Sequence, residues 1–127
     1  QLKEDHIMAK IHIKRAYDDA KDQDGYRILV DRLWPRGIKK EDLHHDEWFK
    51  GIAPSSDLRK DFDHEDDKFT WFKEHYEKEL NNNDEKDSWL SLVKEKLDDG
   101  PVTLLYAAKD KDNNNAVVLK EWTEDHL

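Results

Sequence analysis

The chain has 127 residues, a length that fits one domain. Charged residues make up 42% of it and the formal net charge is −9, which argues against nucleic acid as a partner because phosphate binding requires a net basic face. It contains no cysteine, so disulfides, thiolate nucleophiles and thiolate metal sites are excluded, and a reducing cytoplasm is the expected location.

The N-terminal segment 1–9 is set apart from the rest. It has no apolar core of the length that a signal peptide needs, and Met8 opens a run that reads as a native start. We therefore expect 1–9 to be a flexible or vector-derived end and 10–127 to be a single domain. The longest uncharged apolar run, 102–108, is too short to span a bilayer, so a soluble protein with no membrane partner is predicted.

The first part of the chain predicts two strands. Apolar residues alternate with polar residues over 10–17, and this period of two is typical of a strand. After a polar loop, the apolar run within 26–33 predicts a second strand, which the following proline and glycine end. Residues 38–45 are expected to form a short helix, and 47–53 are compatible with a short strand or with irregular chain.

Helical spacing dominates the second part. The expected elements are a helix over 57–63, a helix that Asp66 or Asp67 caps and the asparagines 81–83 end, helices over 87–97 and over 116–122, and a buried central strand over 102–108. Strands and helices thus alternate along the chain. This order predicts an α/β fold, a three-layer single domain with a small, mainly parallel sheet flanked by helices.

Three segments carry a resemblance to a known family: DRLWPRG at Asp31–Gly37, WFKGIAPSSDLRKDF at Trp48–Phe62 and GPVTLLYAAKD at Gly100–Asp110. Together they are similar to the YeaO-like family of small bacterial proteins, a family of domains of unknown function. The resemblance runs from about residue 10 to the C-terminus, and it implies an α/β fold but no biochemical role. One departure is Asn113, because the family pattern often has a histidine in this loop, and an acid–base role of that histidine could not be repeated here.

Asp31, Arg32 and Arg36 follow the second predicted strand directly. Ligands of open α/β sheets bind at strand ends, and the planar fork of arginine suits carboxylate or phosphate. The functional interpretation is an anion clamp. The alternative is an ion pair of Asp31 with an arginine that only holds the Trp34-Pro35 turn in place.

Two other segments offer candidate groups. Ser55 and Arg59 stand at the start of a predicted helix, where free N–H groups and the helix dipole attract anions, although a serine there is also an ordinary cap. Lys109, Asp110 and Asn115 lie between the central strand and the last helix, where many α/β proteins place ligand-binding groups. The alternative for this second segment is a loop that only caps the final helix.

The same loop has part of the spacing of a calcium-binding loop. Asp110, Asp112, Asn114 and Glu121 fall at its positions 1, 3, 5 and 12. However, Asn115 stands where that loop needs glycine, and a strand precedes it instead of a helix. The sequence therefore predicts no metal and no other cofactor.

Two functions from different classes follow. The first is a polar pocket for a small anionic metabolite that carries a phosphate or carboxylate group, and the protein could be an enzyme. The predicted ligand-binding residues are Arg32, Arg36, Ser55, Arg59 and Asn115, and the candidate catalytic residues are Asp31 and Asp110 as proton acceptors and Lys109 as an electrostatic stabiliser. The second is a noncatalytic regulatory or interaction module whose acidic surface meets a basic partner. The oligomeric state is left open.

Overall fold

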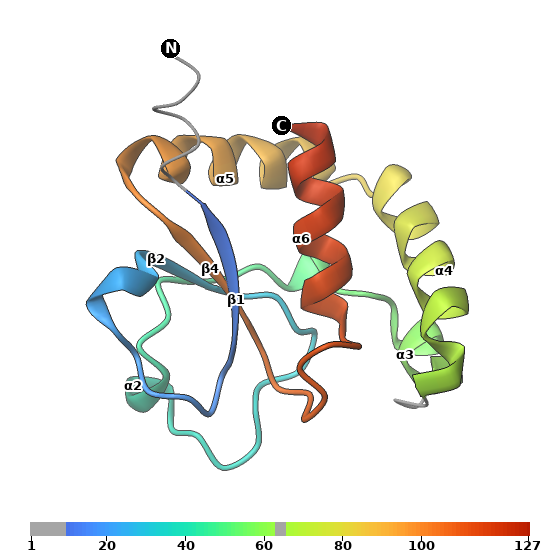
Figure 1. The fold of residues 1–127 in the computed structure, drawn as a ribbon, viewed down its shortest axis with the longest axis horizontal. Coiled ribbons are helices and arrows are strands. Elements are labelled where there is room, and N and C mark those ends of the chain that lie inside the picture. The colour runs from blue at the N-terminus through green and yellow to red at the C-terminus, as the bar shows by residue number, and fades with distance from the viewer. Residues whose placement is uncertain (1–9, 63–65) are drawn as a thin grey trace.

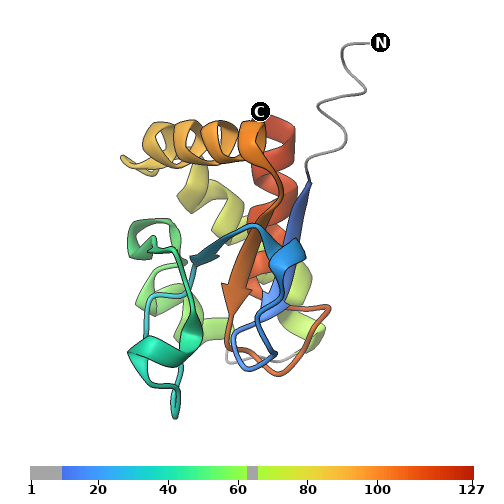
Figure 2. The ribbon, with the colours of Figure 1, turned by 90° about the vertical axis from the view of Figure 1, so that its left-hand side faces the viewer.

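A parallel four-stranded sheet organises the chain (Figures 1 and 2). The structure is a computed structural model that describes residues 10–62 and 66–127, so the predicted segment 1–9 lies outside the described residues. The strands are β1 (Ile11–Arg15), β2 (Tyr26–Leu29), β3 (Glu47–Trp48) and β4 (Val102–Tyr106), in the order β1-β4-β2-β3. All neighbouring pairs are parallel. The predicted α/β fold with a parallel sheet is confirmed.

The position of β4 follows from its composition. All five of its residues are buried, and it lies between β1 and β2, so the prediction of a central strand is confirmed. Its register places Val102 opposite both Ile11 and Tyr26. Strand β2 is shorter than predicted and ends at Leu29, although the N–H of Val30 still donates to the Leu105 carbonyl at 3.1 Å.

Five α-helices occur in the described part of the chain, and each matches a predicted segment within a few residues. They are α2 (Lys40–Leu43), α3 (Ser56–Phe62), α4 (Phe69–Asn81), α5 (Lys86–Asp99) and α6 (Asn115–His126), with 3₁₀ turns at Asp22–Asp24, Lys50–Ile52 and Asp66–Lys68. The predicted cap of α4 at Asp66 or Asp67 is wrong, because the acidic residues form the preceding 3₁₀ turn and Lys68 takes the cap position. None of these helices has the length and apolar content to cross a membrane.

The two faces of the sheet are covered differently. On one face, alternate strand residues such as Ile28, Val30 and Leu104 share a core with buried residues of α3, α4, α5 and α6. On the other face, Leu29 and Leu105 belong to a smaller cluster. The chain between β2 and β3 supplies Leu43 of α2 and the half-buried Trp34 and Ile38 to it, and Ala16 and the half-buried Trp48 of β3 complete it. The chain between β2 and β3 thus forms the third layer.

A buried ionic cluster lies beside this smaller core. The Asp24 carboxylate accepts hydrogen bonds from Lys14 at 2.9 Å and from the Arg27 guanidinium, and both Asp24 and Arg27 are buried. Arg27 also donates to the carbonyls of Leu43 and His44 at 2.9 and 3.0 Å. Burial alone would raise the pKa of Asp24, but the hydrogen bonds from Lys14, from the Lys21 backbone and from Arg27 lower it below its usual value.

Gly25 sets the start of β2. Its φ is +67°, and a Cβ at this position would lie 2.0 Å from the carbonyl oxygen of Pro101. The neighbouring N–H of Tyr26 donates to the same oxygen at 3.0 Å. Only glycine therefore lets the backbone approach Pro101 closely enough to begin the pairing of β2 with β4.

We expect Gly25→Ala to destabilise the protein more than Gly37→Ala. Gly37 also has a positive φ, of +79°, but a Cβ there would meet nothing within 4 Å. Gly37→Ala should lower the free energy of unfolding by about 1–2 kcal/mol from backbone strain alone. Gly25→Ala should cost at least about twice as much. Urea denaturation of both variants measures the difference, and equal losses would contradict the close approach.

Asp24→Asn should lower the free energy of unfolding by about 3–5 kcal/mol at pH 7, because it leaves Arg27 charged and buried without a carboxylate. The pKa of Asp24 is depressed in the folded state, so its contribution is present above the unfolded pKa and is lost as the pH falls through the folded pKa. The two stability curves should therefore converge in acid. Exposed Asp98 is the control, and Asp98→Asn should leave the curve unchanged.

Candidate functional site

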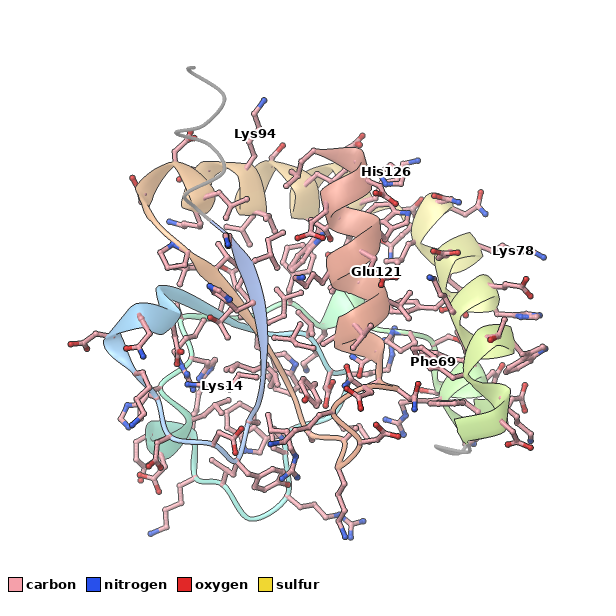
Figure 3. All side chains as sticks on the ribbon, in the orientation of Figure 1. Lys14, Phe69, Lys78, Lys94, Glu121 and His126 are labelled. Carbon is pink, nitrogen blue, oxygen red and sulfur yellow. The ribbon has the colours of Figure 1, made fainter. Side chains whose placement is uncertain are left out.

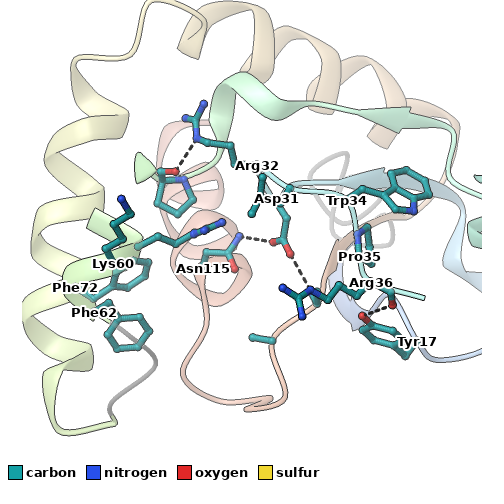
Figure 4. A pocket seen from close by; sticks show the side chains of 15 residues that line it. Tyr17, Asp31, Arg32, Trp34, Pro35, Arg36, Lys60, Phe62, Phe72 and Asn115 are labelled. Carbon is teal, nitrogen blue, oxygen red and sulfur yellow. Dashed lines mark hydrogen bonds between the residues drawn. The ribbon is translucent and has the colours of Figure 1, made fainter. Parts of the chain in front are cut away.

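A cavity of about 470 Å³ opens at the carboxyl ends of β2 and β4 (Figure 4). Because these strands are parallel neighbours, the loops that follow them leave the same edge of the sheet, which is where open α/β sheets bind ligands. The lining residues are Tyr17, residues 31–36, Pro54, Arg59, Lys60, Phe62, Phe72, Ala107, Ala108 and Asn115.

Asp31 joins the elements that meet at the cavity. Its carboxylate oxygens accept hydrogen bonds from the Ala107 N–H at 2.9 Å and from the Asn115 amide at 3.0 Å. Its backbone carbonyl accepts a hydrogen bond from the Trp48 indole at 2.7 Å. Figure 4 marks the hydrogen bond between this carboxylate and Asn115 with a dashed line. One residue therefore connects the end of β2 to the end of β4, to β3 and to the first residue of α6.

Arg32 points its guanidinium to the backbone before α3. Nε donates to the Pro54 carbonyl at 3.1 Å and Nη2 donates to the Ala53 carbonyl at 3.2 Å. These bonds use part of the donor fork of a half-buried side chain. Arg32 therefore lines the cavity and also fixes the loop after β2 to the segment that leads into α3.

The remaining three cations of the wall have no side-chain partner among the described residues. Arg36 and Lys60 are exposed and Arg59 is half-buried. Within residues 10–62 and 66–127, none of the three side chains forms a hydrogen bond or an ion pair. Among the described residues, the wall has four basic residues, counting Arg32, and one acidic residue, Asp31, whose formal charges sum to +3. This described part of the wall is basic in a chain whose net charge is −9.

Ser55 does not line the cavity, because it caps α3. Its Oγ accepts a hydrogen bond from the Leu58 N–H at 3.1 Å and donates to Glu79 at 2.6 Å, and its N–H donates to the same carboxylate at 2.9 Å. Tyr76 of α4 is a buried neighbour of this segment. Its pKa is raised well above the usual value, first by burial and then by the charges of Asp31 and Glu79. The Tyr76 hydroxyl therefore stays protonated and donates to the Ile52 carbonyl at 2.6 Å.

The loop before α6 contributes one of its three predicted residues to the cavity. Asn115 is part of the wall, whereas Lys109 and Asp110 are not. The Asp110 carboxylate accepts hydrogen bonds from the backbone N–H groups of Asp112 and Asn113, at 2.9 and 3.0 Å, and so closes a turn. Asn113 also donates its side-chain amide to Asp110 at 3.1 Å.

The calcium-loop spacing does not produce a calcium-loop geometry. Asn114 caps α6, since its side chain accepts a hydrogen bond from the Val117 N–H at 3.0 Å. Glu121 lies further along α6 and pairs with Lys73 of α4 at 3.0 Å. In the described ranges, no group of three or more His, Cys, Asp or Glu side chains is arranged to hold a metal ion. The helix-capping alternative describes this loop.

Several residues of the wall were not predicted. Lys60 adjoins Arg59, so the pair of basic residues is visible in the sequence and could have been included. Tyr17 could not have been included from the sequence, because it follows β1, and β4 separates β1 from β2 in the sheet. It reaches the cavity through its hydroxyl, which donates to the Arg36 carbonyl at 2.8 Å. Phe62 and Phe72 are buried residues of the larger core that also line the cavity.

This chain belongs to the family described as the inactive DUF488-N3 subclade, whose model matches residues 10–127. It is 50% identical over 112 residues to the uncharacterized protein YeaO of Escherichia coli strain K12, a match that covers 88% of this chain and 95% of YeaO. Over 71 residues it is 41% identical to the uncharacterized proteins Mb3100c of Mycobacterium bovis and Rv3073c of Mycobacterium tuberculosis strain H37Rv, covering 56% of this chain and 60% of each relative. No solved structure matches it significantly. The resemblance to the YeaO-like family is confirmed.

We expect Asp31→Ala to lower the free energy of unfolding by about 2–3 kcal/mol, since it removes the acceptor of a backbone N–H and of the Asn115 amide. Asn115→Ala should cost about 1 kcal/mol. The double variant should lose less than the sum of the two, because the residues share a hydrogen bond. Urea denaturation measures the three values. Exposed Glu74 on α4 serves as the control, and strict additivity would contradict the coupling.

Proposed function

We propose that the protein binds a small anionic ligand, one that carries a phosphate or carboxylate group, in the cavity at the ends of β2 and β4, and that it does so without catalysis. One observation carries this proposal. Arg36, Arg59 and Lys60 come from two separate segments of an acidic chain and line one cavity with no partner in the described structure. Guanidinium and ammonium groups in that arrangement can donate charge-assisted hydrogen bonds to a shared anion.

The hydrogen bonds of the Asp31 carboxylate support the part of the proposal that excludes catalysis. A general base needs a carboxylate oxygen that can reach the proton it removes. Both oxygens of Asp31 already accept hydrogen bonds that hold the sheet and α6 together. The other candidate catalytic residues, Lys109 and Asp110, are not part of the wall. The family description, an inactive subclade, agrees with a binding role.

The acidic remainder of the surface has its own consequence for binding. With a net charge of −9, the protein repels anions at long range, and the attraction of the cavity acts only at short range. Salt screens interactions between exposed charges, with a Debye length of about 8 Å at 0.15 M. The ligand is therefore expected to be small enough to enter the cavity, where the attraction acts over less than the Debye length. A cytoplasmic location is part of the same proposal, and the lack of cysteine is compatible with it.

The test is binding of inorganic phosphate and acetate, followed by calorimetry and by thermal unfolding. A ligand at one hundred times its dissociation constant should add about 2.7 kcal/mol to stability. Arg59→Gln should weaken binding by about 10- to 100-fold, because it removes a charged donor. Lys78→Gln removes the same charge from the outer side of α4, where Figure 3 shows the side chain pointing to solvent, and should change nothing.

Two results would refute the proposal. One is that no anion binds to the unaltered protein, which would favour the alternative of an interaction module that uses its acidic surface. The other is that Arg59→Gln and Lys78→Gln weaken binding equally, which would mean that only the net charge of the protein matters.

A further inference from the structure

The cavity is larger and more apolar than an inorganic anion requires. A water molecule takes about 30 Å³ in the liquid, so a cavity of about 470 Å³ has room for roughly fifteen of them, several times the volume of a phosphate ion. Five of its fifteen lining residues are charged, and every other one except Asn115 is apolar or aromatic. Pockets for organic ligands have this composition, in which a few polar groups orient a ligand and apolar groups contact its body.

Two of the apolar residues are unusually exposed. Four large hydrophobic residues are exposed in the described part of the chain, and two of them, Tyr17 and Leu33, line this cavity, with exposed fractions of 42% and 59%. The exposure of Leu33 follows from its neighbour. The Trp34 indole donates to the Ile38 carbonyl at 2.7 Å and packs edge-on against Trp48, which anchors the loop and leaves Leu33 outside the core.

The Tyr17 ring is held in place at the cavity. Its hydroxyl donates to the Arg36 carbonyl, and the Arg15 guanidinium lies over the ring, 4.8 Å from its centroid. Arg15 is itself fixed by hydrogen bonds to the carbonyls of Ala107 and Ala108 at 3.2 and 2.9 Å. The ring therefore loses little conformational freedom when a ligand packs against it, which favours binding.

Cationic and apolar groups lie on both sides of the cavity. Figure 4 shows Lys60 beside Phe62 and Phe72 on one side, and Arg36 beside Tyr17 on the other. The two phenylalanine rings stack with their centroids 4.5 Å apart, so this side is rigid. A ligand between the two sides would meet a cation and an apolar surface together.

We propose that the ligand is a small organic anion, in which a phosphate or carboxylate group pairs with Arg36 and Arg59 and an aromatic or aliphatic body packs against Tyr17 and Leu33. This inference rests on the proposed function and narrows it. Burial of apolar surface, which contributes about 25 cal/mol per Å², would favour such a ligand over a free inorganic anion. The same surface would discriminate little among apolar bodies of similar size.

The experiment compares phenyl phosphate with inorganic phosphate by calorimetry. The unaltered protein should bind phenyl phosphate at least about tenfold more tightly, a difference of about 1.4 kcal/mol. Leu33→Ser should weaken phenyl phosphate by about threefold or more and leave inorganic phosphate unchanged. Since Leu33 is largely exposed, its replacement should not disturb folding. Leu127→Ser, at another exposed leucine that is not part of the wall, is the matched control.

The outcomes separate the two proposals. Equal affinities for the two phosphates, with both lost in Arg59→Gln, would overturn the organic anion and leave the anion site intact. Failure of both phosphates to bind would overturn the anion site and, with it, the ligand class. A loss of phenyl phosphate affinity that is as large in Leu127→Ser as in Leu33→Ser would also overturn the role of the apolar rim.

Discussion

The carboxylate of Asp31 is the interaction on which the site depends. It accepts hydrogen bonds from the backbone N–H of Ala107 and from the amide of Asn115, so it holds together the ends of two parallel strands and the start of the last helix. Parallel strands are not joined by a hairpin turn, so beyond the last hydrogen bond of the backbone ladder their ends are held by side chains and by crossover connections. An acid at this position therefore determines where the cavity wall lies.

The hydrogen bonds that Asp31 accepts from Ala107 and Asn115 come from uncharged groups, and among the described residues no ion pair joins a carboxylate to a basic residue of the wall. Arg32 donates to backbone carbonyls that carry no formal charge, and Arg36, Arg59 and Lys60 face the cavity or solvent. Like charges that line one cavity repel one another, and a bound anion would reduce that repulsion. This repulsion links the arrangement around Asp31 to the binding that we propose.

The buried ionic cluster beside the smaller core differs from the cavity, because its charges pair within the protein. There Asp24 satisfies Arg27 and Lys14 within the protein, and the cluster is closed. In the described residues, no buried side-chain polar atom lacks a hydrogen-bond partner. The described residues thus contain one ionic cluster whose charges pair within the protein and one cavity with several basic residues in its wall. The second is the candidate site for the binding that we propose.

The sequence by itself determined the elements and much of the site. The continuous apolar run of β4 predicted a central strand, because only a strand covered on both faces can bury every side chain. The motif after β2 located Asp31, Arg32 and Arg36, since charge that follows a buried strand must lie at the sheet edge. Capping residues such as Ser55 were ambiguous, because a serine before a helix has the same sequence context whether it binds a ligand or the helix.

Tertiary structure decided which of these residues meet. Arg59 reaches the cavity because Arg32 fixes the segment before α3 to the loop after β2, and Tyr17 reaches it across β4. Neither contact has a local pattern in the sequence. The strand order β1-β4-β2-β3 is set by the burial of both sheet faces at once, a property of the whole chain that no single segment carries. Local periodicity determines an element, whereas the convergence of distant side chains depends on how all the elements pack.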